Sequence, residues 1–238
     1  MPLAVVLVAP RNPLNIGAAA RAMKNFGFAD LRLVNPYHVA FREARSAVGA
    51  ASVLRAALEY ASVADAVADA ALVVGTTSVG HRQPQHPLRK LEPGAREMRR
   101  RMQPGNVALL FGSEKFGLSN DDLSHCHWLL RISTADPDQS MNLGQAVAVC
   151  LYELTRNPRG RLAPVKARKP ARAGDLEQIT RMLLELCRES GYVNPVVAGS
   201  TENKIRRLVR RLDLSAADAP LWLGILRQAL WKLHEKSE

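Results

Sequence analysis

The sequence predicts an α/β fold in which helices cover both faces of a parallel sheet, followed by a smaller part that is entirely helical. Short, continuously apolar runs alternate with segments of helical periodicity up to about residue 155, as is typical of sheets buried on both faces. After a basic, proline-rich stretch the pattern becomes wholly helical. A length of 238 residues with 47% apolar residues suffices for one full domain and a smaller one.

Five apolar runs are expected to form the strands of the sheet. In chain order they are residues 4–8, 31–34, 71–74, 107–111 and 128–132. The segments between them have apolar residues at helical spacing, as in Ala18, Ala22 and Phe26, and Gly27 is placed to end that helix. The expected helices are 15–26, 44–60, 88–102, a short helix ending at 123, and 142 to about 155.

The chain is expected to divide at a basic linker. We predict a first domain at 1–158, a linker at 159–174 and a helical extension at 175–238, because prolines alternate with Lys and Arg across the linker. In the last helix, 221–233, we expect Ile225, Leu226 and Ala229 to point inward, with two tryptophans as further apolar anchors. In 204–212 the apolar stripe and the arginines are expected on different faces.

The charge of the chain predicts an anionic partner. Lys and Arg number 33 against 22 Asp and Glu, which gives a net charge of +11. The apolar runs are far shorter than the ~20 residues that a membrane-spanning helix needs, so we expect no membrane span. Cys126, Cys150 and Cys187 lie far apart without a C-x-x-C pair, which favours a reducing, cytoplasmic compartment. His, Cys and His are adjacent at 125–127 and alternate in direction, so we interpret them as structural and expect no metal.

Several common site signatures are missing from the sequence. No G-x-G-x-x-G follows the first strand, which argues against a nicotinamide oxidoreductase. No G-x-x-x-x-G-K-[ST] occurs, which argues against nucleotide hydrolysis. Neither H-E-x-x-H nor G-x-S-x-G is present, so zinc proteases and serine hydrolases of the usual kinds are also disfavoured.

Three polar loops follow expected strands, at the sheet edge where open α/β folds place their ligands. They are residues 12–21, 111–119 and 136–144. Each also has a purely structural interpretation: Asn15 and either Ser140 or Asn142 could cap helices, Arg21 could be a solvated helix arginine, and 111–119 could be a plain strand-to-helix turn. Capping does not account for all three loops together.

The three loops resemble the sequence motifs of the SpoU (TrmH) branch of the SPOUT RNA methyltransferases. The matching segments are NIGAAARAMKNFG at 15–27, LLFGSEKFGLS at 109–119 and ISTADPDQSMNLGQAVAVCLYEL at 132–154. They occur in the family order with similar spacing. GYVNP at 191–195 and KIRRLVRRLDL at 204–214 resemble the helical tail of the bacterial tRNA 2′-O-methyltransferases that act on cytidine or uridine at the first anticodon-loop nucleotide.

The resemblance implies a SPOUT-type parallel sheet with a deep C-terminal trefoil knot, whose loops bind the methyl donor S-adenosylmethionine. The residues that it assigns to cofactor binding are Thr76, Thr77, Ser78, Gly112, Gly117, Ile132, Ser140 and Met141. Those it assigns to catalysis are Asn15, Arg21, Glu114, Ser140 and Asn142. The stretch VGHR at 79–82 departs from relatives, which often have Ala-Arg followed by another basic residue, and Arg82 is the best candidate there for RNA contact.

The implied chemistry is an in-line attack of a ribose 2′-oxygen on the sulfonium methyl group, with loss of one proton. The family role of proton acceptor falls on Arg21. Because a guanidinium with a pKa above about 12 is a poor base, the alternative role for Arg21 is to bind the neighbouring phosphate and orient the hydroxyl. Either role requires Arg21 for turnover.

The expected partners are tRNA and a second copy of the chain. The residues expected to contact RNA are Arg11, Arg82, Arg206, Arg207 and Arg210. The resemblance implies a homodimer with the cofactor site near its interface, where Arg21 could act in its own subunit or across the dimer. Two alternatives remain open: a ribosomal RNA methyltransferase of the same branch, and a non-catalytic RNA-binding factor on this scaffold.

Overall fold

The structure is a computed structural model, and it describes residues 2–37, 41, 51–78, 85–102, 105–136, 140–156, 169–193 and 198–235. A seven-stranded sheet in which every pairing is parallel forms its centre, in the order β3-β2-β1-β6-β4-β7-β5. The strands are β1 (Leu3–Val8), β2 (Asp30–Val34), β3 (Leu58–Tyr60), β4 (Leu72–Thr76), β5 (Leu88–Lys90), β6 (Val107–Phe111) and β7 (Trp128–Arg131).

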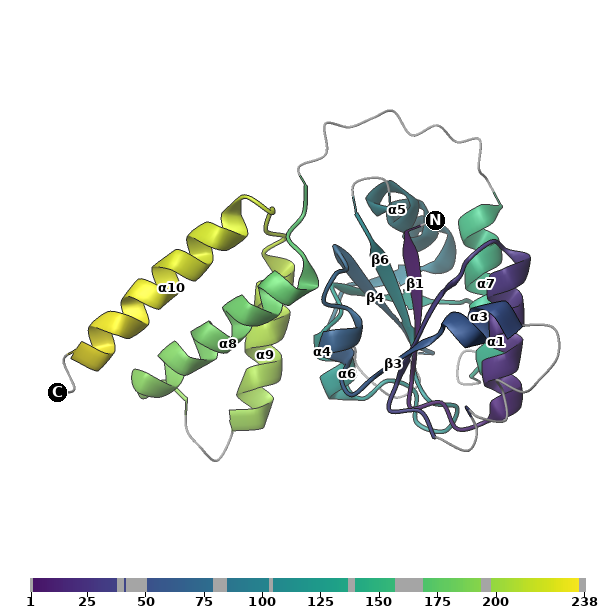
Figure 1. The fold of residues 1–238 in the computed structure, drawn as a ribbon, viewed down its shortest axis with the longest axis horizontal. Helices are drawn as coiled ribbons and strands as arrows, with labels where there is room; N and C mark the ends of the chain where they lie inside the picture. Colours follow the sequence, from purple (N-terminus) through teal and green to yellow (C-terminus); the bar gives the residue numbers. More distant parts are fainter. Residues whose placement is uncertain are drawn as a thin grey trace.

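Helices cover both faces of the sheet (Figure 1). The first face is covered by α1 (Pro13–Asn25), α3 (Ala51–Ala56), α5 (Leu91–Arg101) and α7 (Leu143–Thr155). The second face is covered by α4 (Val63–Ala66) and α6 (Asn120–Ser124). The predicted α/β class with a doubly covered parallel sheet is therefore confirmed.

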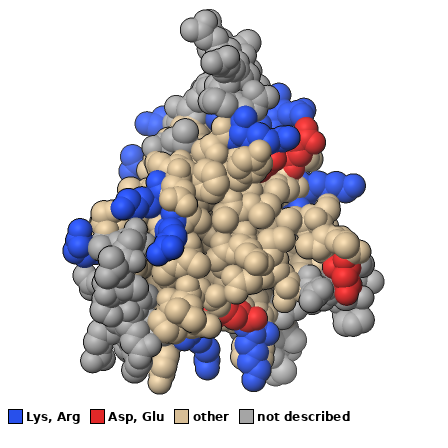
Figure 2. All heavy atoms as spheres, turned by 90° about the vertical axis from the view of Figure 1, so that its right-hand side faces the viewer, with Lys and Arg blue, Asp and Glu red and all other residues tan. Residues whose placement is uncertain are grey.

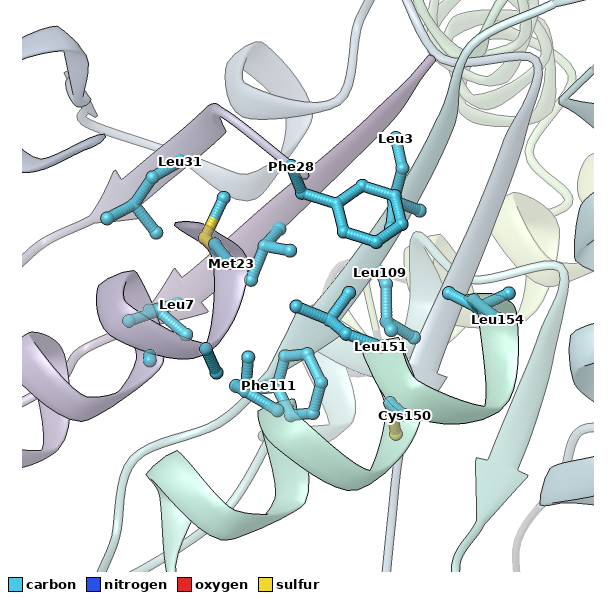
Figure 3. Close-up of a cluster of buried hydrophobic side chains, with 14 of the residues drawn as sticks. Leu3, Leu7, Met23, Phe28, Leu31, Leu109, Phe111, Cys150, Leu151 and Leu154 are labelled. Carbon is cyan, nitrogen blue, oxygen red and sulfur yellow. The ribbon is translucent and has the colours of Figure 1, made fainter. Parts of the chain in front are cut away.

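Alternating side chains of the strands supply both halves of the core. In β1, the side chains of Leu3, Val5 and Leu7 point to the first face, whereas those of the intervening residues point to the second. On the first face these side chains pack against α1 and α7, where Met23 and Leu151 are fully buried (Figure 3). Continuous apolar runs are thus required because each strand is buried on both sides.

Two short edge strands correct the predicted helices. Residues 44–60 were expected to be helical, but α3 ends at Ala56 and Leu58–Tyr60 pairs with β2; residues 42–50 lie outside the described part of the chain. Residues 88–102 were likewise expected to be helical, but Leu88–Lys90 pairs with β7 before α5 begins. In both cases pairing with an existing strand outweighs local helical preference.

Three helices make up most of the described chain after residue 169: α8 (Ala173–Glu189), α9 (Ala198–Arg211) and α10 (Asp218–Glu235). They share a core of their own, and α8 and α9 lie beside α4 and α6, whereas α10 packs on α8 (Figure 1). At the start of α8, the Ala173 amide donates to the Ala70 carbonyl at 2.7 Å and the Gly174 amide to the Ala68 carbonyl at 2.8 Å. The extension is therefore joined to the second face of the α/β part by main-chain hydrogen bonds.

The orientation of α10 differs from the predicted one. Leu226 is buried as expected, but Ile225 is 55% exposed and Trp231 is equally exposed. Because α10 packs mainly on α8, only one side of it is covered, and Ile225 falls outside that side. None of the described helices combines the length and the apolar composition needed to cross a membrane.

Candidate functional site

A pocket of about 490 Å³ opens at the carboxyl ends of the central strands β4, β6 and β7. This is the edge at which parallel α/β sheets bind ligands, and the volume suits a small organic ligand. All eight predicted cofactor residues line it, namely Thr76, Thr77, Ser78, Gly112, Gly117, Ile132, Ser140 and Met141. The structure thus brings together residues from three separate stretches of the sequence.

A larger groove of about 620 Å³ lies between α8 and α10, but its lining is almost entirely apolar. Tyr192, Leu186 and Leu233 are among the residues that form it. A specific ligand site needs a few converging polar groups to orient the ligand. We therefore assign the candidate site to the smaller pocket, whose wall includes four hydroxyl side chains from the predicted set.

The loop after β6 forms one wall of the pocket and turns back tightly on itself. The Gly117 amide donates to the Ser113 carbonyl at 2.9 Å, and Gly117 has a φ of 66°. A Cβ atom at Gly112 would lie 2.0 Å from the Gly117 carbonyl carbon. No side chain fits at position 112, so the two glycines are required for the loop to close beside the pocket.

The end of β4 forms another wall. The Thr76 hydroxyl donates to the Leu110 carbonyl at 2.9 Å, and the Thr77 amide donates to the Leu130 carbonyl at 3.0 Å. These bonds connect β4 to both of its neighbours where the strands end. The three hydroxyl residues at 76–78 are held at the rim as a result.

Glu114 is the centre of a hydrogen-bond network beside the pocket. Its carboxylate accepts from the Arg11 amide at 3.2 Å, the Asn12 amide at 3.2 Å and Asn15 Nδ2 at 3.0 Å. Partial burial alone would raise the pKa of Glu114, but the hydrogen bonds from Asn15 and from main-chain amides outweigh it and lower the pKa below its ordinary value. The group is therefore a carboxylate at neutral pH and joins the loop after β6 to the start of α1.

Asn15 extends this network to the third loop. Its Oδ1 accepts from Asn142 Nδ2 at 2.9 Å, and Asn142 Oδ1 accepts from the amides of Gly144 and Gln145. Asn142 is the N-cap of α7, one of the two residues foreseen for that position. The other capping assignment was wrong: Asn12 caps α1, with its side chain accepting from the Leu14 amide at 2.9 Å, and Asn15 lies within the helix.

Helices α1 and α7 cross closely next to this network. A Cβ atom at Gly144 would lie 2.6 Å from the Cβ of Ala18. The small residues of the first and third loops therefore let the two helices approach until Asn15 and Asn142 are in contact. The run of small residues at 17–20 has a packing function in addition to any contact with a ligand.

Arg21 is exposed on α1 and does not line the pocket of its own chain. Within the described residues it makes no hydrogen bond or ion pair with another side chain. Asn15, which lies nearly two helical turns before it, belongs to the network beside the pocket. The structure therefore brings together four of the five predicted catalytic residues around one site, with Arg21 on the neighbouring surface.

The predicted RNA contacts separate into three groups. Arg11 is exposed and Arg207 is half-buried, whereas Arg82 lies outside the described residues. Arg206 is only 5% exposed and Arg210 only 2%, and both pair with Glu177 of α8. The prediction that Arg206 and Arg210 contact RNA is corrected here, because their guanidinium groups are buried and used by protein partners.

Some residues of the site were not predicted from the sequence. Lys115, Phe116, Leu118 and Thr134 also line the pocket, and Asn12 holds Glu114 through its amide. The Asn12-Pro13 pair carried a usable signal, because Asn is favoured at the N-cap and Pro at the first helical position. The others follow from the path of the loops through space and have no signal of their own.

The fold and the site define an α/β protein with a pocket of small-ligand size at the carboxyl edge of a parallel sheet. The sequence model of the SpoU rRNA Methylase family matches residues 2–152, which contain every wall of the pocket. The chain belongs to this SpoU methylase family.

Relatives match almost the whole chain. A protein of Pectobacterium atrosepticum named tRNA (cytidine/uridine-2'-O-)-methyltransferase TrmJ is 33% identical, and the match covers 98% of each chain. The crystal structure of TrmJ from Z. mobilis ZM4 is 31% identical with a TM-score of 0.81, and the match covers 94% of this chain and 97% of that one. A structure titled "Structural insights into the 2-OH methylation of C/U34 on tRNA" is 27% identical with a TM-score of 0.51, covering 67% and 97%.

Proposed function

We propose that this protein is an S-adenosylmethionine-dependent RNA 2′-O-ribose methyltransferase that acts on tRNA, at cytidine or uridine of the first anticodon-loop nucleotide. The observation that carries the proposal is the pocket at the ends of β4, β6 and β7, beside which Glu114, Asn15 and Asn142 join the three loops. The near-complete match to relatives named as tRNA methyltransferases supports the substrate. A cytoplasmic location agrees with such a substrate.

The pocket fits the methyl donor in size and in chemistry. The hydroxyl groups of Thr76, Thr77 and Ser78 could bind its polar groups, while Leu118 and Ile132 could contact its adenine ring. The donor, when bound, supplies a methyl group on a sulfonium that leaves as a neutral thioether. The chain's own task is therefore to bind, to orient the ribose and to manage one proton, with no requirement for a metal.

The residues beside the pocket position the loops. Glu114 is already occupied by donors from the start of α1, and Asn142 by its cap and by Asn15. Both therefore act by fixing the geometry of the site, while Ser140, exposed in the pocket wall, is available to a ligand. Arg21 either accepts the proton of the 2′-hydroxyl or binds the adjacent phosphate and orients that hydroxyl.

A homodimer completes this arrangement. The side of the molecule formed by α1 and α7 has a broad centre without Lys, Arg, Asp or Glu, and charged side chains lie around it (Figure 2). Leu14 and Tyr152 are exposed on these helices, and Tyr152 packs edge-on against Phe26. An uncharged centre with a charged rim is typical of an interface between subunits. Arg21 of α1 would then reach the pocket of the second copy.

The fold of the proposed enzyme includes a deep trefoil knot within the domain at 1–158. In support, Ile132 and Thr134 after β7 and Ser140 and Met141 before α7 line the pocket, as the resemblance implies for the loops of the knot. The basic segment at 159–174 would then link the knotted domain to the extension at 175–238. Tracing the main chain in a crystal structure would decide whether the knot is present.

Arg21→Ala tests the proposed activity. Incubation with radiolabelled S-adenosylmethionine and total RNA that lacks the modification should label tRNA, and mapping should place the methyl group on one anticodon-loop ribose. We expect turnover by Arg21→Ala to fall by roughly 10²–10⁴-fold, with affinity for the methyl donor retained. Arg96→Ala, at an exposed arginine on α5, is the matched control.

The outcomes of this experiment separate the alternatives. Label in ribosomal RNA but not in tRNA would indicate a ribosomal RNA methyltransferase of the same branch. No label in any RNA would contradict the proposed enzymatic activity. A non-catalytic RNA-binding factor would then be the remaining interpretation. Near-normal turnover by Arg21→Ala would contradict both roles given to Arg21.

A further inference from the structure

Six polar residues form an ion-pair cluster where the helical extension meets the second face of the α/β part, and we call it the interdomain cluster. It draws on α6 and the residue after it, on α8 and on α9. Its members are Asp121, Ser124, His125, Glu177, Arg206 and Arg210.

Arg206 makes most of the contacts of this cluster. Its Nε lies 3.2 and 3.1 Å from the two carboxylate oxygens of Glu177, and its Nη1 donates to Ser124 Oγ at 3.0 Å. Its Nη2 donates to Glu202 at 2.6 Å, and Asp121 lies 3.6 Å from Nη1. A guanidinium that is 5% exposed must be paired in this way to offset the loss of water. Arg206 therefore connects α8 and α9 to α6.

Arg210 completes the link one turn further along α9. Its Nη1 donates to the Ala173 carbonyl at 3.1 Å and its Nη2 to Glu177 at 3.3 Å. Ala173 is the first residue of α8, and its amide donates to the Ala70 carbonyl of the α/β part. Arg210 thus stabilises the main-chain junction, whereas Arg206 reaches across it.

Helix α6, which Arg206 contacts through Ser124 and Asp121, also forms part of the pocket wall. Ser119 and Asp122 form a capping box at the start of α6, with the Ser119 amide 2.8 Å from Asp122 Oδ2. Leu118 directly precedes this capping box, and Leu123 directly precedes Ser124. Both leucines are buried, and both line the pocket. Helix α6 is therefore contacted by Arg206 on one side and forms the pocket wall on the other.

We propose that Arg206 is a positioning residue that couples the docking of the helical extension to the shape of the cofactor pocket. Arg206 fixes α6 through Ser124 and Asp121, and α6 fixes Leu118 and Leu123 in the pocket wall. This inference rests on the proposed function, since it takes the pocket to bind S-adenosylmethionine. It gives the extension a part in binding the methyl donor, although no described residue of the extension lines that pocket.

Titration calorimetry of the full-length protein with S-adenosylmethionine, without RNA, tests the coupling. We expect Arg206→Met to weaken binding by about 5–10-fold, equivalent to about 1–1.4 kcal/mol, and Arg206→Lys to recover part of the loss. Lys204→Met, at an exposed position on the same helix, should bind as the wild type does. In turnover assays Arg206→Met should raise KM for the donor and keep kcat at saturation. A purely structural role would lower only the thermal midpoint.

Ser124→Ala keeps the inference testable if Arg206→Met fails to fold. This change removes the hydrogen bond from Arg206 and the one that Ser124 Oγ donates to the Asp121 carbonyl, and it leaves the pairing of Arg206 with Glu177 in place. We expect a roughly 2–3-fold weaker affinity for the donor, less than the full contribution of one hydrogen bond. An unchanged affinity in a folded Arg206→Met, or in Ser124→Ala, overturns the coupling. A wild-type protein that binds no S-adenosylmethionine would instead contradict the proposed function.

Discussion

Two glutamates organise two regions of this molecule in different ways. Glu114, beside the pocket, is exposed and accepts hydrogen bonds from two main-chain amides and one side-chain amide. Glu177, between the α/β part and the extension, is 6% exposed and faces two buried guanidinium groups. The first carboxylate is held by neutral donors and the second by opposite charges.

The difference shows how burial decides what a carboxylate contributes. Near water, neutral donors suffice to place Glu114, and their net contribution to stability is modest. In the interior, Glu177 neutralises two arginines that could not otherwise remain there. We therefore expect the region around Glu114 to be sensitive mainly in activity, and the region around Glu177 mainly in stability.

Glu177→Gln should have the largest effect on stability. The change leaves Arg206 and Arg210 buried without their shared counter-charge, so the free energy of unfolding in urea should fall by about 3–5 kcal/mol. Glu202→Gln removes a more exposed partner of Arg206 and should cost less than about 1 kcal/mol. Equal losses for the two variants would contradict the conclusion that burial decides what a carboxylate contributes to stability.

Glu114→Gln should reduce activity more than stability. A neutral amide has one oxygen for three donors, so the loop after β6 should shift relative to α1. We expect methyl transfer to fall roughly 10–100-fold, as a misplacement of about 1 Å can cause, with about 1–2 kcal/mol lost from unfolding. Glu92→Gln, on the exposed side of α5, is the control. A large loss of stability with normal activity would contradict this assignment.

Lowering the pH should reduce the stability of the protein through His125 of the interdomain cluster, by less than these substitutions do. Burial, together with the charges of Arg206 and Arg210, lowers the pKa of His125 to about 3. In the unfolded chain His125 has its ordinary pKa of about 6.5 and binds a proton below it, whereas in the folded protein it stays neutral. Stability is therefore lost as pH falls through about 6.5. From pH 7 to pH 6 this linkage is worth roughly 0.7 kcal/mol.

Urea unfolding of His125→Gln at the two pH values measures that contribution. Its stability should fall less between pH 7 and pH 6 than that of the wild type, by the amount given above. His234→Gln, a change at an exposed histidine of α10, is the control. A wild-type pH dependence in His125→Gln would mean that this histidine is not buried in its neutral form.

The strands that are buried on both faces could be predicted from the sequence, and the edge strands could not. β1 and β6 are continuous apolar runs because both of their faces are covered. β3 and β5 have three residues each, and their leading leucines are exposed, so they carry no apolar pattern. Their backbone pairing with β2 and β7 is a tertiary property that no local window contains.

The candidate site, like the fold, could be predicted from the sequence only in part. The pocket-lining residues could be named because the three loops resemble family motifs, but the bond between Asn15 and Asn142 joins residues 127 positions apart. The RNA contacts predicted for Arg206 and Arg210 were the clearest error. Arg206 and Arg210 lie next to the apolar stripe of the helix, and they are buried because Glu177 on another helix offers a counter-charge. Nothing within α9 indicates that carboxylate.

The close crossing of α1 and α7 at Ala18 and Gly144 constrains how this sequence can evolve. A methyl group added at 144 would meet the one at 18 and push the helices apart, together with the asparagines that each of them carries. Changes at the two positions must therefore compensate each other in volume. Among homologues, residue sizes at these two sites should vary jointly, although neither residue lines the pocket.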